Sequence, residues 1–580
     1  MRCVKIKYGE KFQKYIDFLA DCQYSDGRFW AKLVKQYEKR IDYKDLGWRG
    51  EFWGKLMRGA SMLVDNVSNK RIYSVLERTV KDMLSKQDEF GRFSTYPIEK
   101  EFDGWDIWCR KYVMLGMLYF LEVCRSETLK IQIIDSLCLH ANYIMERVGV
   151  GKIPINQTSK AWGAVNSYSI LQPIVKLYSI TKNKKYYDYA IELIDKQQVF
   201  GENLFRIAYE DKIKPFEYPV VKAYEMISCF EGLLDFYEIT KEKKCLETCK
   251  KFADAVLESD FTLVGGTGCY DEMFDNSTKK QVTPIEMHMQ ETCVTVTLMK
   301  YLSKLNEIEY NASYVDAIER SLYNVYLGAF KINGNDKRAC VYSYSPLINK
   351  HRFEVIGGMK KLGYKEFCGC CISIAGAGLG VVNKTIITCE KDLIRLNLFI
   401  DGSYTIRCGR ENLVFSIKGG YPFGSKVFLV VEKGVKKAIK LAFRKPTWAE
   451  NAVITVKDKR ISEIKDCFIV EGMFSDGEVI ELEMNNLVKL ISSKEFDQNA
   501  RERVAVVKGA ITYCADARYA KTDDEYDFDG QISFESQKVD EVECLVLKNE
   551  RGNAVTLLPY MYAGDDKTPI TVWIKKKISR

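Results

Sequence analysis

The sequence contains little histidine and no long apolar segment. Only His140, His288 and His351 occur in its 580 residues, and none of them has the spacing of a zinc-binding histidine pair. No run of 18 apolar residues is present, and the opening MRCVKIKYGEKFQKY has no apolar stretch of the kind found in signal peptides. We therefore expect no membrane span, no secretory signal and no histidine-based metal site.

The chain also has no dominant charge. Its 87 basic and 79 acidic residues leave a formal net charge of +8, and short basic runs such as 575–577 are typical of solvated surface. Nucleic acid is therefore not an expected partner.

Cysteine, in contrast, is abundant. The 19 cysteines are scattered and odd in number, which is not the pattern of a disulfide framework. Without an export signal, we expect a cytoplasmic protein whose thiols stay reduced and mostly serve as small buried side chains.

The first two thirds of the sequence has helical periodicity and a repeat. Apolar residues recur at helical spacing over 111–123, 223–239 and 292–305. Tyr119, Tyr178 and Tyr237 are each 59 residues apart, and each lies in an apolar helix followed by a polar turn and a second amphipathic helix. This period is typical of stacked helical hairpins, and about six of them closed in a ring would form an (α/α)6 barrel.

After about residue 385 the apolar period changes to two. Short alternating runs separated by Gly, Asp and Asn turns predict an all-β sandwich or jelly roll. We therefore expect a barrel domain over 1–385, whose first few residues could pair with the β part, and a β-sandwich region over 386–580 with one or two subdomains.

The segment CGCC carries the clearest chemical signal. Cys368, Cys370 and Cys371 form a C-x-C-C pattern that chance would produce only about 0.02 times in a chain with this many cysteines. Clustered thiolates are typical zinc ligands. The best complement is Glu291 and Cys293, two residues apart where a helix is expected to begin, which would complete a Cys₃Glu site. A structural site that includes Cys368, or no metal at all, remains an alternative.

Two further segments suggest a sugar site. Glu272 lies in the glycine-rich segment VGGTGCYDEMF, which lacks the residues of a phosphate-binding loop, and a carboxylate there is a candidate acid/base for glycoside hydrolysis. Six of the eight tryptophans lie in the first 162 residues, and Trp105 and Trp108 flank Asp106. Aromatic faces and carboxylates together are typical of sugar pockets, although packing between helices explains most tryptophans.

Taken together, these segments resemble glycoside hydrolase family 127, the β-L-arabinofuranosidase family. The similarity extends over most of the chain, and the combination of QETCVTV with CGCC is its specific part. Further matching segments are GWRGEFWGK (47–55), WDIWCRKYVMLGML (105–118), VGGTGCYDEMF (264–274), FRKPTWA (443–449) and RVAVVKGAITY (503–513).

The resemblance implies an (α/α)6 barrel with β-sandwich domains and a retaining glycosidase. It implies Zn²⁺ ligands at Glu291, Cys293, Cys370 and Cys371, a nucleophile at Cys370 and an acid/base at Glu272. As substrate contacts we expect Trp105, Asp106, Tyr224 and Glu225. The expected partner is an oligosaccharide with a terminal β-L-arabinofuranosyl or similar pentofuranosyl group, and a homodimer is left open.

The sequence departs from the family where substrate specificity is set. A positive charge expected after the Cys370–Cys371 pair is missing, and substrate-facing histidines have no counterpart near Gln172 or in 222–225. Two alternatives therefore stay open: the same chemistry on another furanoside, and a catalytically idle carbohydrate-binding protein with a structural zinc.

Overall fold

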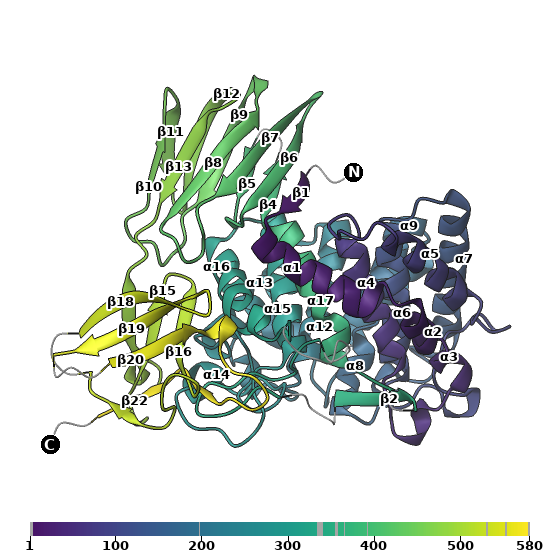
Figure 1. The fold of residues 1–580 in the computed structure, drawn as a ribbon. Coiled ribbons are helices and arrows are strands. Elements are labelled where there is room, and N and C mark those ends of the chain that lie inside the picture. The colour runs from purple at the N-terminus through teal and green to yellow at the C-terminus, as the bar shows by residue number, and fades with distance from the viewer. Residues whose placement is uncertain are drawn as a thin grey trace.

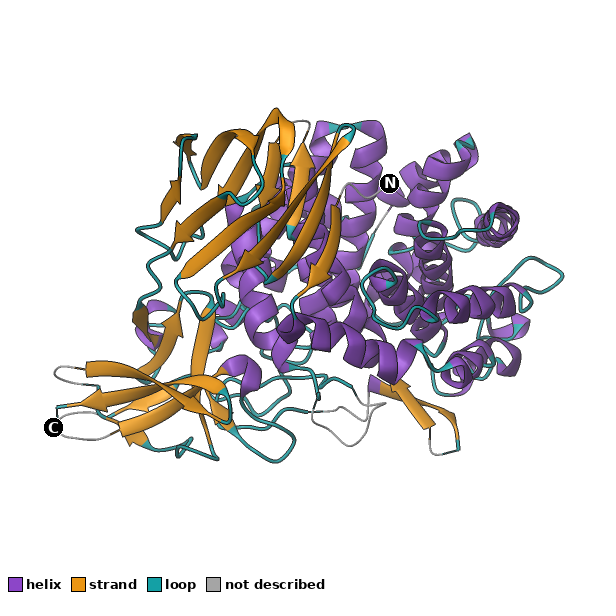
Figure 2. Cartoon of the chain, turned by 45° about the horizontal axis from the view of Figure 1, so that its top comes forward, coloured by secondary structure: helices purple, strands orange, loops and turns teal. Residues whose placement is uncertain are grey.

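The fold is described from a computed structural model that places residues 4–196, 198–332, 340–353, 358–364, 366–390, 393–528, 532–550 and 554–577. In Figure 1 the helices gather in one body and the strands lie mainly in two groups beside it. Figure 2 separates the same two kinds of structure by colour.

Six helices form a closed inner ring, in which each helix packs against the next and the last packs against the first. They are α4 (Gly50–Leu63), α6 (Asp106–Leu121), α9 (Leu171–Thr181), α12 (Ala223–Thr240), α15 (Thr292–Ile308) and α17 (Cys370–Thr385). Most of them are buried nearly all around, which explains why their sequences are almost continuously apolar.

An outer layer of helices covers this ring, and each outer helix packs against an inner one. Its members are α1 (Glu10–Leu19), α5 (Ile72–Leu84), α7 (Glu127–Arg147), α10 (Lys184–Lys196), α13 (Lys243–Ser259) and α16 (Ala312–Ser321). The predicted (α/α)6 barrel is thus confirmed, and Tyr119, Tyr178 and Tyr237 of the 59-residue repeat all lie on inner helices. Shorter helices join the layers: α2 (Gly27–Val34), α3 (Gln36–Lys39), α8 (Val165–Tyr168), α11 (Leu204–Glu210) and α14 (Ser277–Lys280).

Two sheets follow the barrel and form a sandwich, in which β7 packs against β9 of the other sheet. The first sheet has the order β1 (Val4–Tyr8), β6 (Gly402–Cys408), β7 (Glu411–Lys418), β8 (Lys426–Lys433), β13 (Val479–Glu483), β10 (Val453–Val456). The second has the order β11 (Arg460–Ile464), β12 (Cys467–Phe474), β9 (Val435–Arg444), β5 (Leu393–Leu396), β4 (Ile387–Glu390). The N-terminal strand β1 thus lies in a sheet with strands from the second half of the chain, antiparallel to β6.

A third sheet is built from the C-terminal residues. Its path is β17 (Glu525–Tyr526), β22 (Ile574–Lys576), β15 (Arg503–Lys508), β16 (Ile511–Asp516), β20 (Ala554–Pro559), β19 (Val542–Asn549), β18 (Ile532–Val539), with β14 (Val488–Ser492) beside β15 and β21 (Ile570–Thr571) beside β16. Its inner face shares an apolar core with Val264, Cys269 and Met289, so this sheet supports the loops that precede α15. The all-β part is confirmed, whereas the exact division into units over 1–385 and 386–580 stays a prediction.

A short hairpin leads the chain into the last barrel helix. It consists of β2 (Met359–Gly363) and β3 (Glu366–Gly369), and it stands apart from the other sheets in Figure 2. The side chains of Arg49 and Lys39 donate hydrogen bonds to backbone carbonyls of Lys361 and Leu362, at 2.9 and 2.6 Å. The hairpin thereby fixes where α17 begins, at Cys370.

Candidate active site

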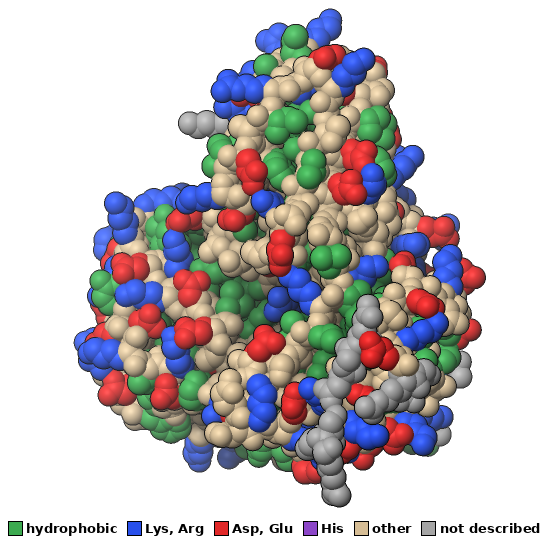
Figure 3. Space-filling model, turned by 90° about the vertical axis from the view of Figure 1, so that its left-hand side faces the viewer, with side chains coloured by type: hydrophobic (Ala, Val, Ile, Leu, Met, Phe, Trp, Pro, Cys, Tyr) green, Lys and Arg blue, Asp and Glu red, His purple; other side chains and the backbone are tan. Residues whose placement is uncertain are grey.

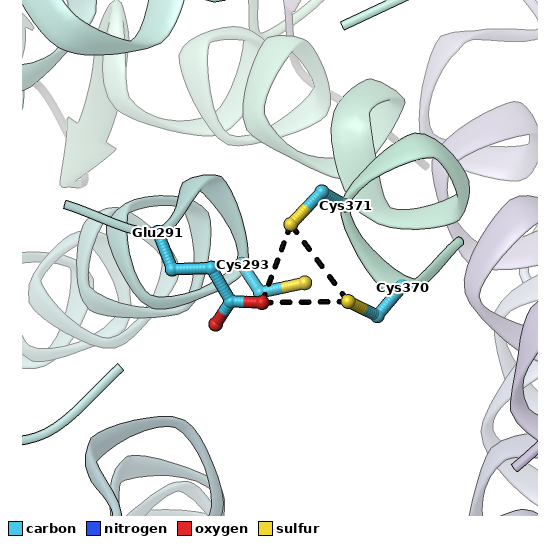
Figure 4. A group of neighbouring side chains, drawn as sticks. All are labelled: Glu291, Cys293, Cys370 and Cys371. Atoms are coloured by element: carbon cyan, nitrogen blue, oxygen red, sulfur yellow. Dashed lines mark hydrogen bonds between the residues drawn. The ribbon is translucent and has the colours of Figure 1, made fainter. Parts of the chain in front are cut away.

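Four side chains from two helix starts converge at the barrel mouth (Figure 4). Glu291 and Cys293 lie at the start of α15, and Cys370 and Cys371 open α17. The sulfur atoms of Cys370 and Cys371 each lie 3.3 Å from Oε1 of Glu291 and 3.8 Å from each other. One ligand atom from each of the four residues lies within 4.8 Å of all the others. We call these four residues the sulfur–carboxylate cluster.

The position of Glu291 is set by the residue before it. Gln290 has a φ of 57°, a conformation that a side chain other than glycine rarely adopts. It is held there because its amide accepts a hydrogen bond from Thr262 at 2.6 Å and donates one to the Ser345 carbonyl at 2.8 Å. The turn places Glu291 just outside the helix, so that it and Cys293 point into the same space (Figure 4).

Burial and mutual hydrogen bonding dominate the electrostatics of the cluster. Burial raises the pKa of Glu291 well above its usual range, and the nearby Cys370 sulfur raises it further. Hydrogen bonds from Cys293 and Cys371 lower the pKa of Cys370 well below that of a free thiol, whereas burial raises the pKa of Cys371. Cys370 is therefore the sulfur of the cluster most disposed to be a thiolate.

The cluster has the composition of a metal site. Three thiols and one carboxylate match the ligands that a divalent transition metal takes from proteins. Oε1 of Glu291 is the carboxylate oxygen that faces both sulfurs, while its Oε2 is buried and has no hydrogen-bond partner among the described residues. Cys368, two residues away, is buried with its sulfur against the Gly369 carbonyl and lies outside the cluster.

A cavity of about 420 Å³ opens over the cluster. It brings the predicted nucleophile and the predicted acid/base, Cys370 and Glu272, into the walls of one pocket. Its other described walls are Trp48, Glu51, Lys55, Trp105, Trp108, Trp162, Lys222, Tyr224, Glu225, Asp271, Met273, Met287, His288, Glu291, Tyr344 and Gly358.

Glu272 reaches the cavity on the glycine-rich loop 264–274. Gly268 has a φ of 85°, and a Cβ there would meet the Asp271 carbonyl at 2.8 Å, so the turn requires glycine. The Gly268 carbonyl accepts a hydrogen bond from the Gln290 backbone at 2.7 Å, which ties this loop to the start of α15. The Glu272 side chain is about one-fifth exposed, and the ammonium of Lys222 contacts its Oε1.

A second lysine–carboxylate pair lies deeper in the same cavity. On α4, Lys55 Nζ donates to Oε1 of Glu51 at 2.9 Å, and the Trp108 indole donates to Oε2 of the same carboxylate. Burial raises the pKa of Glu51 to about 7, although Lys55 opposes the shift. Burial alone would lower the pKa of Lys55, but the negative groups around it, above all Glu51, raise it well above its ordinary value.

Three of the four predicted substrate contacts line the cavity: Trp105, Tyr224 and Glu225. The Glu225 side chain is buried; its Oε1 lies 3.8 Å from Lys222 Nζ, and its Oε2 has no hydrogen-bond partner among the described residues. Asp106 is placed elsewhere. It is fully buried and accepts hydrogen bonds from Ser94, Phe102 and Arg110, at 2.5, 2.9 and 3.0 Å.

The sequence analysis missed six charged or polar residues of the cavity wall: Glu51, Lys55, Lys222, Asp271, His288 and Tyr344. One signal for the first two was present, since Glu51 and Lys55 are an i, i+4 pair inside a buried, largely apolar helix, where an isolated charge would be costly. Lys222 and Glu272 are 50 residues apart, and no local pattern announces their contact.

On the face of the molecule that Figure 3 shows, the visible charged side chains form no patch of a single sign. Lysine and arginine side chains are intermixed there with aspartate and glutamate. In the described part of the chain, no helix has the length and apolar character needed to cross a membrane.

Together, the fold and the site define an (α/α)6-barrel protein with a sulfur–carboxylate centre at the barrel mouth. The chain belongs to glycoside hydrolase family 127. A family model described as "Beta-L-arabinofuranosidase, GH127 catalytic domain" matches residues 19–376, and the model of the middle domain of the same family matches residues 393–486.

Individual relatives agree with this assignment. The non-reducing end β-L-arabinofuranosidase of Bifidobacterium longum subsp. longum is 21% identical over 439 residues, and the match covers 70% of this chain and 64% of that protein. The match thus spans slightly less than two thirds of the relative's length.

Solved structures show the same fold at low identity. A GH127 β-L-arabinofuranosidase from Geobacillus stearothermophilus T6 has a TM-score of 0.75 at 15% identity, covering 99% of this chain and 100% of that one. A second structure, described as a GH127 β-arabinofuranosidase, has a TM-score of 0.74 at 16% identity, covering 99% and 97%.

Proposed function

We propose that this protein is a retaining glycoside hydrolase that releases terminal β-L-arabinofuranosyl groups from oligosaccharides. The observation that carries the proposal is that Cys370 and Glu272 line one cavity of about 420 Å³, a volume suited to a sugar. Family membership and the relatives named β-L-arabinofuranosidase support both the reaction class and the sugar.

Glu291, Cys293, Cys370 and Cys371 would hold a Zn²⁺ ion, since their donor set fits it. When bound, Zn²⁺ would keep the coordinated sulfurs deprotonated at neutral pH. The chain itself already favours this state at Cys370, because Cys293 and Cys371 donate hydrogen bonds toward its sulfur.

In the first step, the Cys370 thiolate attacks the anomeric carbon of the terminal sugar. A carbon–sulfur bond forms, the glycosidic carbon–oxygen bond breaks, and the carboxylic acid of Glu272 gives its proton to the departing oxygen. The aglycone leaves as an alcohol, and Glu272 is left as a carboxylate.

In the second step, the Glu272 carboxylate takes a proton from a water molecule whose oxygen attacks the same carbon. The carbon–sulfur bond breaks, the thiolate of Cys370 is restored, and free sugar with retained anomeric configuration leaves. Partial exposure suits Glu272 to this role, since it must meet both substrate and water.

The remaining cavity walls would orient the sugar. We propose that the Glu225 carboxylate accepts hydrogen bonds from sugar hydroxyls, and that Tyr224 and Trp105 contact the ring. Since the substrate-facing histidines of the family have no counterpart near Gln172 or in 222–225, the same chemistry on a different furanoside is the alternative within this proposal.

Cys370→Ser tests the proposal. The variant should lose at least about 10³-fold in kcat on an aryl β-L-arabinofuranoside, because a serine hydroxyl at this position is a far weaker nucleophile than a thiolate. Cys368→Ser, two residues away and outside the cluster, is the matched control and should keep nearly full activity. NMR of the wild-type reaction should show the β-anomer as the first product.

Three results would count against the proposal. Equal loss in both variants would indicate a folding defect in place of a nucleophile, and an α-anomer as first product would exclude retention. Stoichiometric zinc without turnover of any furanoside would identify a carbohydrate-binding protein with a structural metal.

A further inference from the structure

Buried cations lie in the barrel interior beneath the sulfur–carboxylate cluster. We call Lys55, Arg58, Lys111 and Lys300 the buried cation group; they come from α4, α6 and α15, and none is more than 7% exposed. Two of them are neutralised, because Lys55 pairs with Glu51 and Lys300 pairs with Glu231, each at 2.9 Å.

Arg58 and Lys111 have no such partner. Nε and Nη2 of Arg58 and Nζ of Lys111 are fully buried and find no hydrogen-bond acceptor among the described residues. They lie instead against aromatic rings: Lys111 Nζ is 4.0 Å from the Trp108 centroid, and Arg58 Cζ is 5.6 Å from that of Tyr112. Ring faces compensate a buried cation only in part, so two positive charges remain without a counter-charge.

These cations stand directly below the active-site wall. Lys55 lines the cavity together with Cys370, and Arg58 follows it by three residues on α4, or about 4.5 Å along the helix axis. Lys111 follows Trp108, another wall residue, by the same spacing on α6. One turn further down α15, Lys304 is already paired with Asp235 and Glu238.

The surplus charge matches what the cluster would carry with a metal. Three thiolates and Glu291 bring four negative charges, and a divalent cation cancels two of them. The net charge that then remains at the barrel mouth is negative, opposite in sign to the two unpartnered cations below.

The pKa directions within the group differ. Burial, and next to it the charge of Arg58, lowers the pKa of Lys300 to about 7. Burial and the charge of Lys300 lower the pKa of Lys111 well below its ordinary value. Burial would also lower the pKa of Arg58, but the tyrosines around it, Tyr112 first, and Glu231 raise it above its ordinary value, so Arg58 stays charged.

We propose that Arg58 and Lys111 are positioning residues whose buried charges balance the negative charge of the metal-loaded sulfur–carboxylate cluster. This inference rests on the metal site of the proposed function. It assigns the cost of two unpaired cations in the barrel to metal affinity.

The test compares metal-free and zinc-loaded full-length protein carrying Arg58→Met or Lys111→Met. Zn²⁺ affinity is measured by competition with a chromophoric chelator, and the thiolate absorption band of the Co²⁺ form checks that the ligands are intact. Each Met variant should bind Zn²⁺ about tenfold more weakly, because one counter-charge is gone. Its metal-free form should melt no lower than wild type, because a buried unpaired charge has been removed. Arg58→Lys and Lys111→Arg should restore affinity to within about threefold.

The matched control removes an opposite pair. Lys300→Met with Glu231→Gln leaves the net charge of the barrel interior unchanged and should alter Zn²⁺ affinity by no more than about twofold. A loss in this control as large as in the single Met variants would make packing, not charge, the cause and overturn the inference.

Three other outcomes would also overturn it. Unchanged Zn²⁺ affinity in both Met variants would show that the cluster does not sense these charges, and parallel melting losses with and without metal would show a purely structural role. If chloride or bromide stabilised the metal-free wild type but not Arg58→Met, the unpartnered N–H groups of Arg58 would serve to bind an anion. Wild type that binds no Zn²⁺ would instead refute the proposed metal site itself.

Discussion

Glu51–Lys55 and Glu272–Lys222 are two lysine–carboxylate pairs in the wall of one cavity. The first is an i, i+4 pair on a single helix, fully buried, and both of its carboxylate oxygens already accept hydrogen bonds from Lys55 and Trp108. The second joins residues 50 positions apart, and its carboxylate sits on a loop where about one-fifth of the side chain is exposed.

The comparison separates two properties that are often taken together, a suitable pKa and access to substrate. Burial raises the pKa of Glu51 to about 7, close to the optimum for a general acid at neutral pH, yet its oxygens are occupied and closed to water. Glu272 can reach both a leaving group and a water molecule. Geometry therefore favours Glu272 as the proton donor, and Glu51 as a fixed hydrogen-bond acceptor for Lys55 and Trp108.

The largest expected effect comes from replacing each carboxylate by its amide. Glu272→Gln should lower kcat by about 10³-fold on a substrate with an alkyl aglycone, and much less with a dinitrophenyl aglycone, because that leaving group needs no proton. Glu51→Gln should lower activity by a factor that does not depend on the aglycone. Steady-state kinetics on the two substrates measures this.

If the loss of activity in Glu51→Gln depended on the leaving group and the loss in Glu272→Gln did not, Glu51 would be the proton donor in place of Glu272. Circular dichroism and Zn²⁺ content of both variants provide the control, since either substitution could also disturb the nearby cluster.

The same comparison shows what the sequence could reveal. The inner helices and the convergence of Glu291, Cys293, Cys370 and Cys371 were predictable, because a 59-residue repeat and clustered thiols leave local patterns. The pairing of Lys222 with Glu272 was not, because it depends on how the loop 264–274 returns to the start of α12.

Asp106 shows a different limit. Its neighbours Trp105 and Trp108 do line the cavity, but Asp106 shares a helix face with Arg110, four residues on, and that face turns away toward Ser94 and Phe102. Adjacency in sequence to an aromatic residue of the cavity wall therefore does not place a carboxylate in the same pocket. Helical periodicity separates positions 105 and 108 from 106 and 110.

The second prediction concerns the free energy of unfolding and depends on the titration of Glu51. Its folded pKa is about 7, against an ordinary value of 4.5, so between these pH values the folded protein holds a proton that the unfolded chain has lost. The resulting stabilisation is complete below pH 4.5 and is lost as the pH rises through 7. In metal-free protein, the free energy of unfolding of wild type should therefore fall by about 3 kcal/mol relative to Glu51→Gln over this range.

Urea denaturation of both proteins at several pH values measures this difference. If the difference between wild type and Glu51→Gln stays constant from pH 4.5 to 7.5, Glu51 is more hydrated than its burial implies, and the contrast between the two pairs weakens.

The smallest expected effect concerns the aromatic surroundings of the two lysines. Lys55 lies 4.4 Å from the ring centroid of buried Tyr224, whereas Lys222 faces Trp162, at 5.8 Å, whose side chain is 40% exposed at the cavity wall. Trp162 and the next two residues have φ values of 52°, 61° and 62°, a strained turn that holds the indole outward. An exposed ring in this position can stack on a second sugar, beyond the one that is cleaved.

Trp162→Ala should therefore lower kcat/KM about tenfold on a disaccharide and by less than about threefold on a methyl glycoside, mostly through KM. Trp162→Phe keeps a ring and should recover most of the loss, which separates stacking from a collapse of the turn. Equal losses on both substrates would place Trp162 at the cleaved sugar. Both sides of the cavity would then bind the cleaved sugar, and the Trp162 side would not bind the rest of the oligosaccharide.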